Sequence, residues 1–226
     1  MTSFLSPQLE ALIKSALAGD TSAQNRLGDL YREGNDVDQH YAEALHWYQR
    51  AADAGNAEGQ NNLASMYLNG IGTDPDPVTA VNYYRLAAEQ GLPIAQYNLG
   101  TRYREGDGVT IDLSEAAKWL KLAAQAGDAY AQNDYAVLLR YGNGITQDIL
   151  AATHWFIKAA KRQDVVAVGN LSSIIGELEL IANSGNTKAL QYIKTIKAIL
   201  NEKTVEGKHS RAKKQDKPSP NTQFDF

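Results

Sequence analysis

The chain has 226 residues, 43% of them hydrophobic, no cysteine and a formal net charge of −4 at neutral pH. This hydrophobic fraction is sufficient for a folded core, and the lack of cysteine excludes disulfides, thiolate catalysis and cysteine zinc sites. Residues 1–200 hold 16 Lys or Arg against 22 Asp or Glu, which argues against nonspecific nucleic-acid binding because such binding depends on neutralising phosphates.

Residues 1–20 are expected to form a helix that caps the N-terminal end of the molecule. Apolar residues recur at helical spacing from Leu9 to Leu17, with Glu10 among them. The segment lacks the basic start of a signal peptide, and no apolar run in the chain reaches the roughly 18 residues of a transmembrane helix. We therefore expect a cytoplasmic protein without membrane insertion.

Residues 21–164 contain a repeat with a period of 36 residues. Such a period is typical of stacked supersecondary units, each of which contacts mainly its neighbours. Three series of residues mark the period: Leu27, Leu63, Leu99 and Tyr135; Ala44, Ala80, Ala116 and Ala152; and Trp47, Tyr83, Trp119 and Trp155. We expect the large side chains of these series to form the core.

Each unit is predicted to be a helix followed by a turn and a second helix, as residues 93–128 illustrate. Apolar residues first recur at one helical face, and Gly106 and Gly108 then break the pattern. A second helical pattern follows, which either Asp112 or Ser114 can cap. Four such units, with a tight link between them, account for residues 21–164.

Helix starts and small residues recur with the same period. The residue ahead of each first helix is able to accept a hydrogen bond from an unpaired backbone N–H, except in the third unit, where Pro93 starts the helix instead. These capping residues are Asp20, Asn56, Asp128 and Asp164.

Small residues recur inside the first helices, at Gly28, Ala64, Gly100 and Ala136. They predict that the two helices of a unit cross closely.

The repeat resembles the Sel-one-like repeat (SLR) family, a relative of the tetratricopeptide repeats. Its pattern, clearest in residues 93–128, is A-Q-x-x-L-G-x-x-Y-x-x-G-x-G-V-x-x-D-x-x-x-A-x-x-W-x-x-x-A-A-x-x-G. The first unit departs from it, because Asp36 replaces the second turn glycine and His40 the turn aspartate. The resemblance implies an all-α, right-handed α-solenoid that acts as an adaptor or scaffold, without catalytic activity or a cofactor.

Residues 165–200 depart from the repeat and are expected to form divergent capping helices at the C-terminal end. Two apolar stripes at helical spacing indicate two helices: Leu171, Ile174, Ile175, Leu178 and Ile181, and then Leu190, Ile193, Ile196 and Leu200. The alternative is that these stripes form a dimerisation face. The oligomeric state does not follow from the sequence.

Residues 201–226 form a polar tail that we expect to be disordered. Its basic residues favour a solvated segment, with weak electrostatic contact to an acidic partner as the alternative; they are Lys208, Arg211, Lys213, Lys214 and Lys217. The terminal Phe224-Asp225-Phe226 is a candidate docking motif.

The working surface is expected on the first helices, which line the concave face in tetratricopeptide-like stacks. An asparagine amide has a donor and an acceptor that match a peptide backbone, arginine holds carboxylates, and tyrosine adds rigid contact area. The predicted groove residues are Asn25, Asp29, Arg32, Asn61, Ser65, Leu68, Tyr97, Thr101, Arg104, Tyr130, Asn133, Val137, Arg140 and Tyr141. The alternative is that the asparagines are ordinary polar helix surface.

These residues lead us to expect a protein-interaction adaptor that binds a peptide or helix of a partner, and no catalytic, cofactor or metal site. His46 and His154 share one repeat position with Asn82 and Lys118, which indicates a solvent-facing position rather than a metal ligand. The Gly-x-Gly pairs follow helices, so they are turns and not phosphate loops. The alternatives are a regulatory or immunity protein that inhibits an enzyme, a hydrolase, and an RNA-binding repeat protein.

Overall fold

The structure is a computed structural model that describes residues 6–162 and 164–215, and these residues form helices joined by turns, without a strand. The helices are α1 (Pro7–Leu17), α2 (Thr21–Glu33), α3 (Tyr41–Asp53), α4 (Ala57–Asn69), α5 (Pro77–Glu89), α6 (Pro93–Glu105), α7 (Leu113–Ala126), α8 (Ala129–Tyr141), α9 (Ile149–Lys161), α10 (Val165–Ser173), α11 (Ile175–Asn183) and α12 (Thr187–Gln215).

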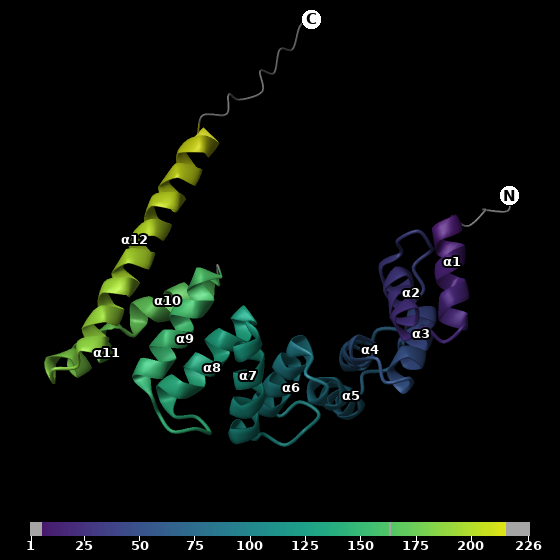
Figure 1. The fold of residues 1–226 in the computed structure, drawn as a ribbon, viewed down its shortest axis with the longest axis horizontal. Helices are drawn as coiled ribbons and strands as arrows, with labels where there is room; N and C mark the ends of the chain where they lie inside the picture. Colours follow the sequence, from purple (N-terminus) through teal and green to yellow (C-terminus); the bar gives the residue numbers. More distant parts are fainter. Residues whose placement is uncertain (1–5, 163, 216–226) are drawn as a thin grey trace, which may run out of the picture.

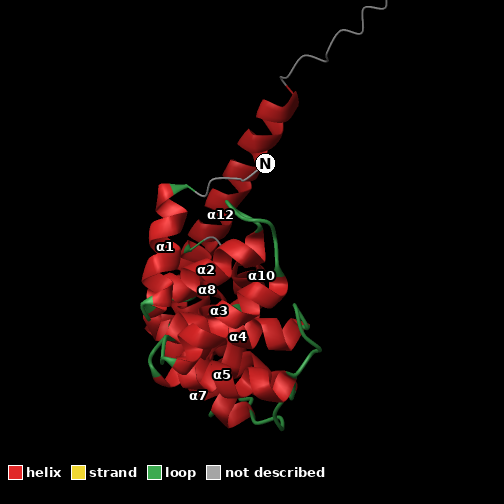
Figure 2. Cartoon of the chain, turned by 90° about the vertical axis from the view of Figure 1, so that its right-hand side faces the viewer, coloured by secondary structure: helices red, strands yellow, loops and turns green. Residues whose placement is uncertain are grey.

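Helices α2 to α9 pair into four units that follow one another along an arc (Figure 1). Each helix packs most closely on the other helix of its unit, and each second helix also packs on the first helix of the next unit. Figure 2 looks onto the N-terminal end of this stack and shows α12 projecting beyond it. The all-α solenoid predicted from the 36-residue period is thereby confirmed.

The predicted capping residues begin the first helices. The Asp20 carboxylate accepts hydrogen bonds from the backbone N–H groups of Ser22 (3.0 Å) and Ala23 (3.1 Å), and the latter contributes most to lowering the pKa of Asp20. Leu92 makes no side-chain cap, as expected for the unit that begins with proline. The caps at Asn56, Asp128 and Asp164 are confirmed in the same way.

The second helices have their own series of caps. Asp112, rather than Ser114, caps α7 by accepting from the N–H groups of Ser114 and Glu115. In the first unit His40 replaces the aspartate, and its Nδ1 accepts from the N–H of Glu43 at 3.2 Å. This departure from the repeat pattern therefore leaves the cap in place, because the imidazole nitrogen supplies the acceptor.

A glutamine in each first helix ties it to the helix before. The side-chain amide of Gln96 donates to the carbonyl oxygen of Ala88, near the end of α5, at 3.3 Å. The same bond recurs at Gln24, Gln60 and Gln132, each to a carbonyl eight residues earlier. All four glutamines are buried. Each of these carbonyls also accepts from the backbone N–H of a turn glycine, as Ala88 does from Gly91 at 3.0 Å. The glutamine therefore adds a second hydrogen bond at the helix end, one that joins consecutive units.

The small residues of the first helices lie where the two helices cross, as predicted. A Cβ atom added to Gly28 would lie 2.5 Å from the ring of Tyr48, and one added to Gly100 would lie 2.8 Å from Leu120. The partners that press against them, Tyr48, Tyr84, Leu120 and Phe156, are at most 3% exposed. This series is buried more deeply than the predicted Trp47 series, of which Tyr83 and Trp155 are only half-buried.

The turn glycines are required because consecutive units meet there. Gly108 and Gly144 have φ angles of 76° and 69°, and a Cβ at Gly108 would lie 2.1 Å from the carbonyl oxygen of Pro77, the first residue of α5. Asp36 holds the corresponding position in the first unit with a φ of 62°. No unit precedes it, and Asp36 borders an open depression beside α1 instead, so a side chain fits.

The C-terminal helices differ from the expected pair. The stripe from Leu171 to Ile181 was expected on one helix, but the chain breaks at Ile174 into α10 and α11, which meet at an angle of 40°. Leu171, Ile174 and Leu178 are nevertheless fully buried. The bend allows both short helices to place their apolar sides on the same core cluster.

Helix α12 covers this end of the stack. Its buried residues are Ala189, Ile193, Ile196 and Ile199, whereas Leu190, which the sequence placed in the stripe, is 48% exposed. The helix continues to Gln215, although we expected disorder from residue 201 onward. The Phe224-Asp225-Phe226 motif lies outside the described residues. Within them, no single helix is long and apolar enough to cross a membrane, and only α10 and α11 together meet that test by length and composition.

Candidate functional site

The predicted groove residues fall into three classes of exposure on helices α2, α4, α6 and α8. Asn25, Asn61, Thr101, Asn133 and Arg140 are buried. Asp29, Arg32, Ser65, Leu68, Tyr97, Arg104 and Val137 are half-buried. Tyr130 and Tyr141 are 66% and 60% exposed. We refer to the accessible side chains of α2, α4, α6, α8 and α10 as the first-helix face.

The asparagines pair with one another between units. The Nδ2 atom of Asn62 donates to Oδ1 of Asn25 at 3.0 Å, and Asn98 donates to Asn61 in the same way. Asn170 on α10 donates to Asn133 on α8 at 2.8 Å, which links the fourth unit to the helix that follows it. We predicted that these amides pair with the backbone of a partner. The structure corrects this in part, because the side-chain oxygens of Asn25, Asn61 and Asn133 already accept hydrogen bonds within the stack.

We call these asparagine pairs between units the asparagine ladder. The link between the third and fourth units, from α6 to α8, is built differently. Tyr97 holds the asparagine position of the third unit, and Asp134 holds the donor position of the fourth. The Asp134 carboxylate instead accepts from Arg104 and, at 3.1 Å, from Asn133. Because an ionised aspartate cannot supply the donor of the asparagine pair, an ion pair takes over the link between α6 and α8.

The three arginines predicted to hold a partner's carboxylates already contact acidic groups of their own chain. Arg32 donates to Glu33 at 2.6 Å and to the Tyr48 hydroxyl at 3.0 Å. Arg104 pairs with Asp134, and the buried Arg140 pairs with Glu177 on α11. These existing contacts occupy part of each guanidinium group, and the use of the three arginines to hold a partner's carboxylates stays a prediction.

Asp29 takes part in the same network at the N-terminal end. The Tyr48 hydroxyl donates to the Asp29 carboxylate at 2.6 Å while accepting from Arg32. Burial of the ring and the neighbouring Asp29 charge raise the pKa of Tyr48, so this phenol stays neutral. The polar residues of α2 thus stabilise the contact between α2 and α3, and they are less available to a ligand than the sequence suggested.

In the C-terminal half, the first-helix face exposes a series of apolar side chains. Ile94, Tyr130 and Val166 are each the second residue of their helix, 36 residues apart, and they are 51%, 66% and 64% exposed. The same position in the first two units holds Ser22 and Glu58. We call Ile94, Tyr130 and Val166 the apolar row. Its 36-residue spacing is visible in the sequence, but only the exposure distinguishes it from the core.

Two tyrosines extend the apolar row across α6 and α8. The rings of Tyr97 and Tyr130 lie with their centroids 6.2 Å apart, at an interplanar angle of 38°. Tyr141, at the far end of α8, lies under the guanidinium of Arg140 at 5.3 Å. Aromatic side chains of this exposure offer large contact area with few rotatable bonds, which favours recognition of another polypeptide.

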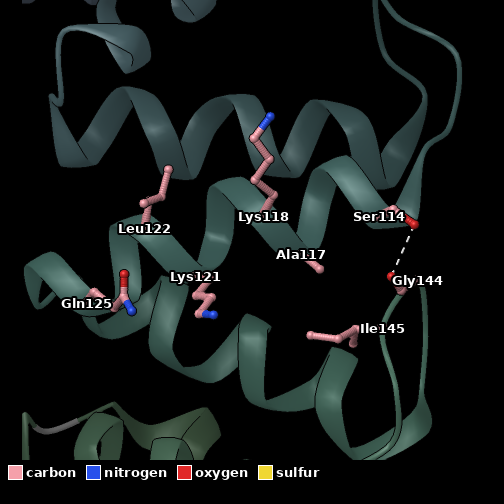
Figure 3. A pocket seen from close by; sticks show the side chains of 8 residues that line it. All are labelled: Ser114, Ala117, Lys118, Lys121, Leu122, Gln125, Gly144 and Ile145. Carbon is pink, nitrogen blue, oxygen red and sulfur yellow. Dashed lines mark hydrogen bonds between the residues drawn. The ribbon is translucent and has the colours of Figure 1, made fainter.

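The second helices carry a separate surface with a different character. A depression of about 520 Å³ lies beside α7. Its lining includes Lys121 and Gln125 of α7 and Ile145 of the segment before α9, and the Ser114 hydroxyl donates to the Gly144 carbonyl at 3.1 Å (Figure 3). His46 and His154 are exposed, as predicted. Among the described residues no three His, Cys, Asp or Glu side chains are grouped as a metal site.

Comparison with known proteins identifies the repeat. The model of the Sel1 repeat matches residues 21–56, 57–92, 93–128 and 129–164, which are the four units. A search of curated proteins found no match.

Two solved structures are similar to the chain over most of its length. One is a protective antigen of uropathogenic Escherichia coli with an SLR fold, which is 37% identical, with a TM-score of 0.72 over 75% of this chain and 36% of the antigen. The other is a Sel1 repeat protein of Oxalobacter formigenes, 33% identical, with a TM-score of 0.70 over 76% of this chain and 50% of that protein. The chain thus spans about a third and a half of these relatives.

Proposed function

The chain belongs to the Sel1 repeat family, whose members are in general protein-interaction scaffolds without enzymatic activity, and on that basis we propose that it is a noncatalytic scaffold that binds a peptide or helix of a partner protein on its first-helix face. We propose further that this face is the concave side of the arc, and that recognition is concentrated on α6, α8 and α10 rather than distributed evenly over the stack.

The apolar row carries this proposal. Exposed apolar side chains cost little when scattered, but we infer that a row repeated at the same position of α6, α8 and α10 offers a partner one strip of apolar surface. Burying such a strip in a complex removes apolar surface from water, at about 25 cal/mol per Å². The predicted residues that belong with the strip are Tyr97, Tyr130, Val137 and Tyr141, whereas the asparagines and arginines hold the helices in position around it.

The two other classes of function receive less support. An enzyme requires a cluster of titratable or nucleophilic groups in a cavity, and Asp29, Arg104 and Arg140 of the first-helix face are engaged in structural pairs. Binding of RNA requires a basic groove, whereas Arg32, Arg104 and Arg140 of this face each contact an acidic side chain.

The proposal is tested by selecting peptides on the immobilised protein from a random library and measuring their affinity by calorimetry. The double variant Ile94→Ser with Tyr130→Ser is expected to weaken the selected peptides about tenfold or more, because it removes two contact side chains. The melting temperature is expected to stay close to that of the wild type, since both side chains are exposed.

A matched control is available on α5. Val78 and Leu86 are 60% and 47% exposed, similar to Ile94 and Tyr130, but they belong to a second helix. The double variant Val78→Ser with Leu86→Ser is expected to leave the affinity unchanged. Equal binding by the wild type and the Ile94/Tyr130 variant would remove the first-helix face from the proposal.

A further inference from the structure

The second helices of the C-terminal half carry an accumulation of exposed lysines. Lys118 and Lys121 lie on α7, Lys158 and Lys161 on α9, and Lys188 at the start of α12. We call these five residues the basic face. The repeat positions of Lys161 in the first two units are Asp53 and Glu89, so the charge at this position changes sign along the stack.

Most of these cations have no acidic partner of their own. Only Lys118 forms an ion pair within the described residues, with Glu115 at 3.2 Å. Glu115 also accepts from the indole N–H of Trp119 at 3.1 Å. The other acidic group beside the lysines, Asp148, caps α9 by accepting from the N–H of Ala151 at 2.8 Å. Both carboxylates therefore have structural roles, and Lys121, Lys158, Lys161 and Lys188 form no ion pair within the part of the chain that the structure describes.

Aromatic rings support three of the ammonium groups. Lys158 lies over the ring of Trp155 at 4.5 Å, Lys118 over Trp119 at 5.2 Å, and Lys188 over Tyr192 at 5.6 Å. An ammonium over an aromatic face is attracted to the ring and loses part of its conformational freedom. The charges are thus partly positioned before any ligand arrives, which lowers the entropic cost of binding an anionic group.

Two depressions flank α9 beneath these charges. The first, of about 520 Å³, lies between α7 and the segment before α9 and has Ala117, Leu122 and Ile145 in its lining (Figure 3). The second, of about 350 Å³, lies between α9 and α12, and Leu150, Trp155 and Tyr192 contribute its apolar surface. The lining of each depression therefore combines apolar side chains with lysine, and that of the second also contains Asp148.

His154 lies in the lining of the second depression. Burial, followed by the charges of Lys158 and Lys188, lowers the pKa of His154 below its usual value of 6.5. This histidine is consequently neutral at physiological pH, and the lysines carry the charge. The two lysines come from different helices, α9 and α12, which shows that the positive charge converges on one place rather than following a single helix.

We propose that the basic face is a second binding surface, separate from the first-helix face, which takes an acidic segment of another protein with apolar side chains between its carboxylates. Carboxylates of such a segment complement the lysines that form no ion pair among the described residues, and its apolar side chains fit the apolar lining of the two depressions. A nucleic acid matches this surface less well, because its charged backbone leaves that apolar lining uncovered and residues 1–200 are acidic overall.

The test measures the fluorescence anisotropy of a labelled peptide of alternating Glu and Leu on the full chain. We expect saturable binding that weakens as salt screens the charges. The double variant Lys121→Glu with Lys158→Glu is expected to lose affinity about tenfold or more, because two attractive contacts become repulsive. Absence of saturable binding by the wild type would overturn the proposal.

The matched control makes the same change of charge elsewhere. Arg50 occupies the repeat position of Lys158 in the first unit and lies over Trp47 at 5.3 Å, and Lys14 is exposed on α1. The double variant Lys14→Glu with Arg50→Glu is expected to keep the wild-type affinity within about twofold. An equal loss in both double variants, or tighter binding of a single-stranded oligonucleotide of the same charge, would contradict the assignment.

Discussion

The two halves of the stack share one framework and differ in their surfaces. Residues 1–92 hold five Lys or Arg against twelve Asp or Glu, whereas residues 93–200 hold eleven against ten. The exposed row on the first helices is polar in the first half, at Ser22 and Glu58, and apolar in the second, at Ile94, Tyr130 and Val166. Both proposed binding surfaces lie in the second half.

This difference shows which repeat positions the fold constrains. Positions at helix crossings, caps and turns hold similar residues in most units, because the same contacts recur at each interface. Positions on the outside of the helices vary from unit to unit, and we propose that recognition depends on these positions. The asparagine ladder is the exception, since its side chains are polar and yet belong to the framework.

Substitution of the turn glycines is expected to have the largest effect on stability. It tests whether consecutive units approach each other equally closely in both halves of the stack. An added Cβ would lie 2.1 Å from backbone at Gly108 and 2.9 Å at Gly72. Gly108→Ala is expected to lower the free energy of unfolding by about 2–4 kcal/mol, from the left-handed conformation and the overlap together. Gly72→Ala should lower the free energy of unfolding by a smaller amount. Urea denaturation of both variants measures the difference.

Asp36 is the control for this series. It already has a side chain and a φ of 62°, so Asp36→Gly relieves backbone strain but increases the entropy of the unfolded chain. These effects oppose each other, and we expect a change within about 0.5 kcal/mol. Equal losses at positions 72 and 108 would argue that the overlap with the preceding unit is not the cause.

The asparagine ladder gives the next largest effect. Asn98→Ala removes the donor to Asn61, whose buried oxygen then lacks its partner, and we expect a loss of about 1–3 kcal/mol in the free energy of unfolding. Asn82→Ala, on the exposed side of α5, is the matched control and should change stability by less than about 0.5 kcal/mol. A similarly small change in the free energy of unfolding for both variants would indicate that the asparagine ladder is ordinary polar surface.

A helix cap in the second half is expected to have a smaller effect. Asp128 accepts from the N–H of Ala131 at 2.7 Å, and Asp128→Ala should lower the free energy of unfolding by about 1 kcal/mol. Asp128→Asn keeps an acceptor oxygen and is expected to restore most of the loss. If Asn destabilises as much as Ala, then the charge rather than the hydrogen bond is what stabilises α8.

The smallest effect concerns the pKa of His154. Lys158→Gln removes one of the two charges that lower this pKa, so titration by NMR should show it moving up toward 6.5. Because the folded-state pKa is depressed, protonation of His154 favours unfolding, and its contribution to stability is lost as the pH falls below 6.5. Arg50→Gln, far from His154, should leave this pKa where it is.

The framework was predictable from the sequence because it repeats. The 36-residue series identified the helices, their caps and the close crossings at Gly28 and Gly100. The bend at Ile174 and the continuation of α12 to Gln215 were not predicted, since these segments have no second copy with which to compare them.

The candidate site was predicted less well, for a physical reason. Polarity alone suggested that Asn61 and Arg140 face solvent, but each is buried and paired with the neighbouring helix. Sequence reasoning did not single out Ile94 as a contact residue, and the structure shows that this apolar side chain is exposed. A side chain's type indicates what it prefers, whereas its neighbours in the next unit decide where it lies.

The central claim, that recognition resides in the second half of the stack, is tested most directly by hydroxyl-radical footprinting of the full chain with and without a selected peptide. The account predicts that Ile94 and Tyr130 become protected, while Tyr41 and Val78, which are also exposed, keep their reactivity. Protection of Tyr41 with no change at Tyr130 would contradict it.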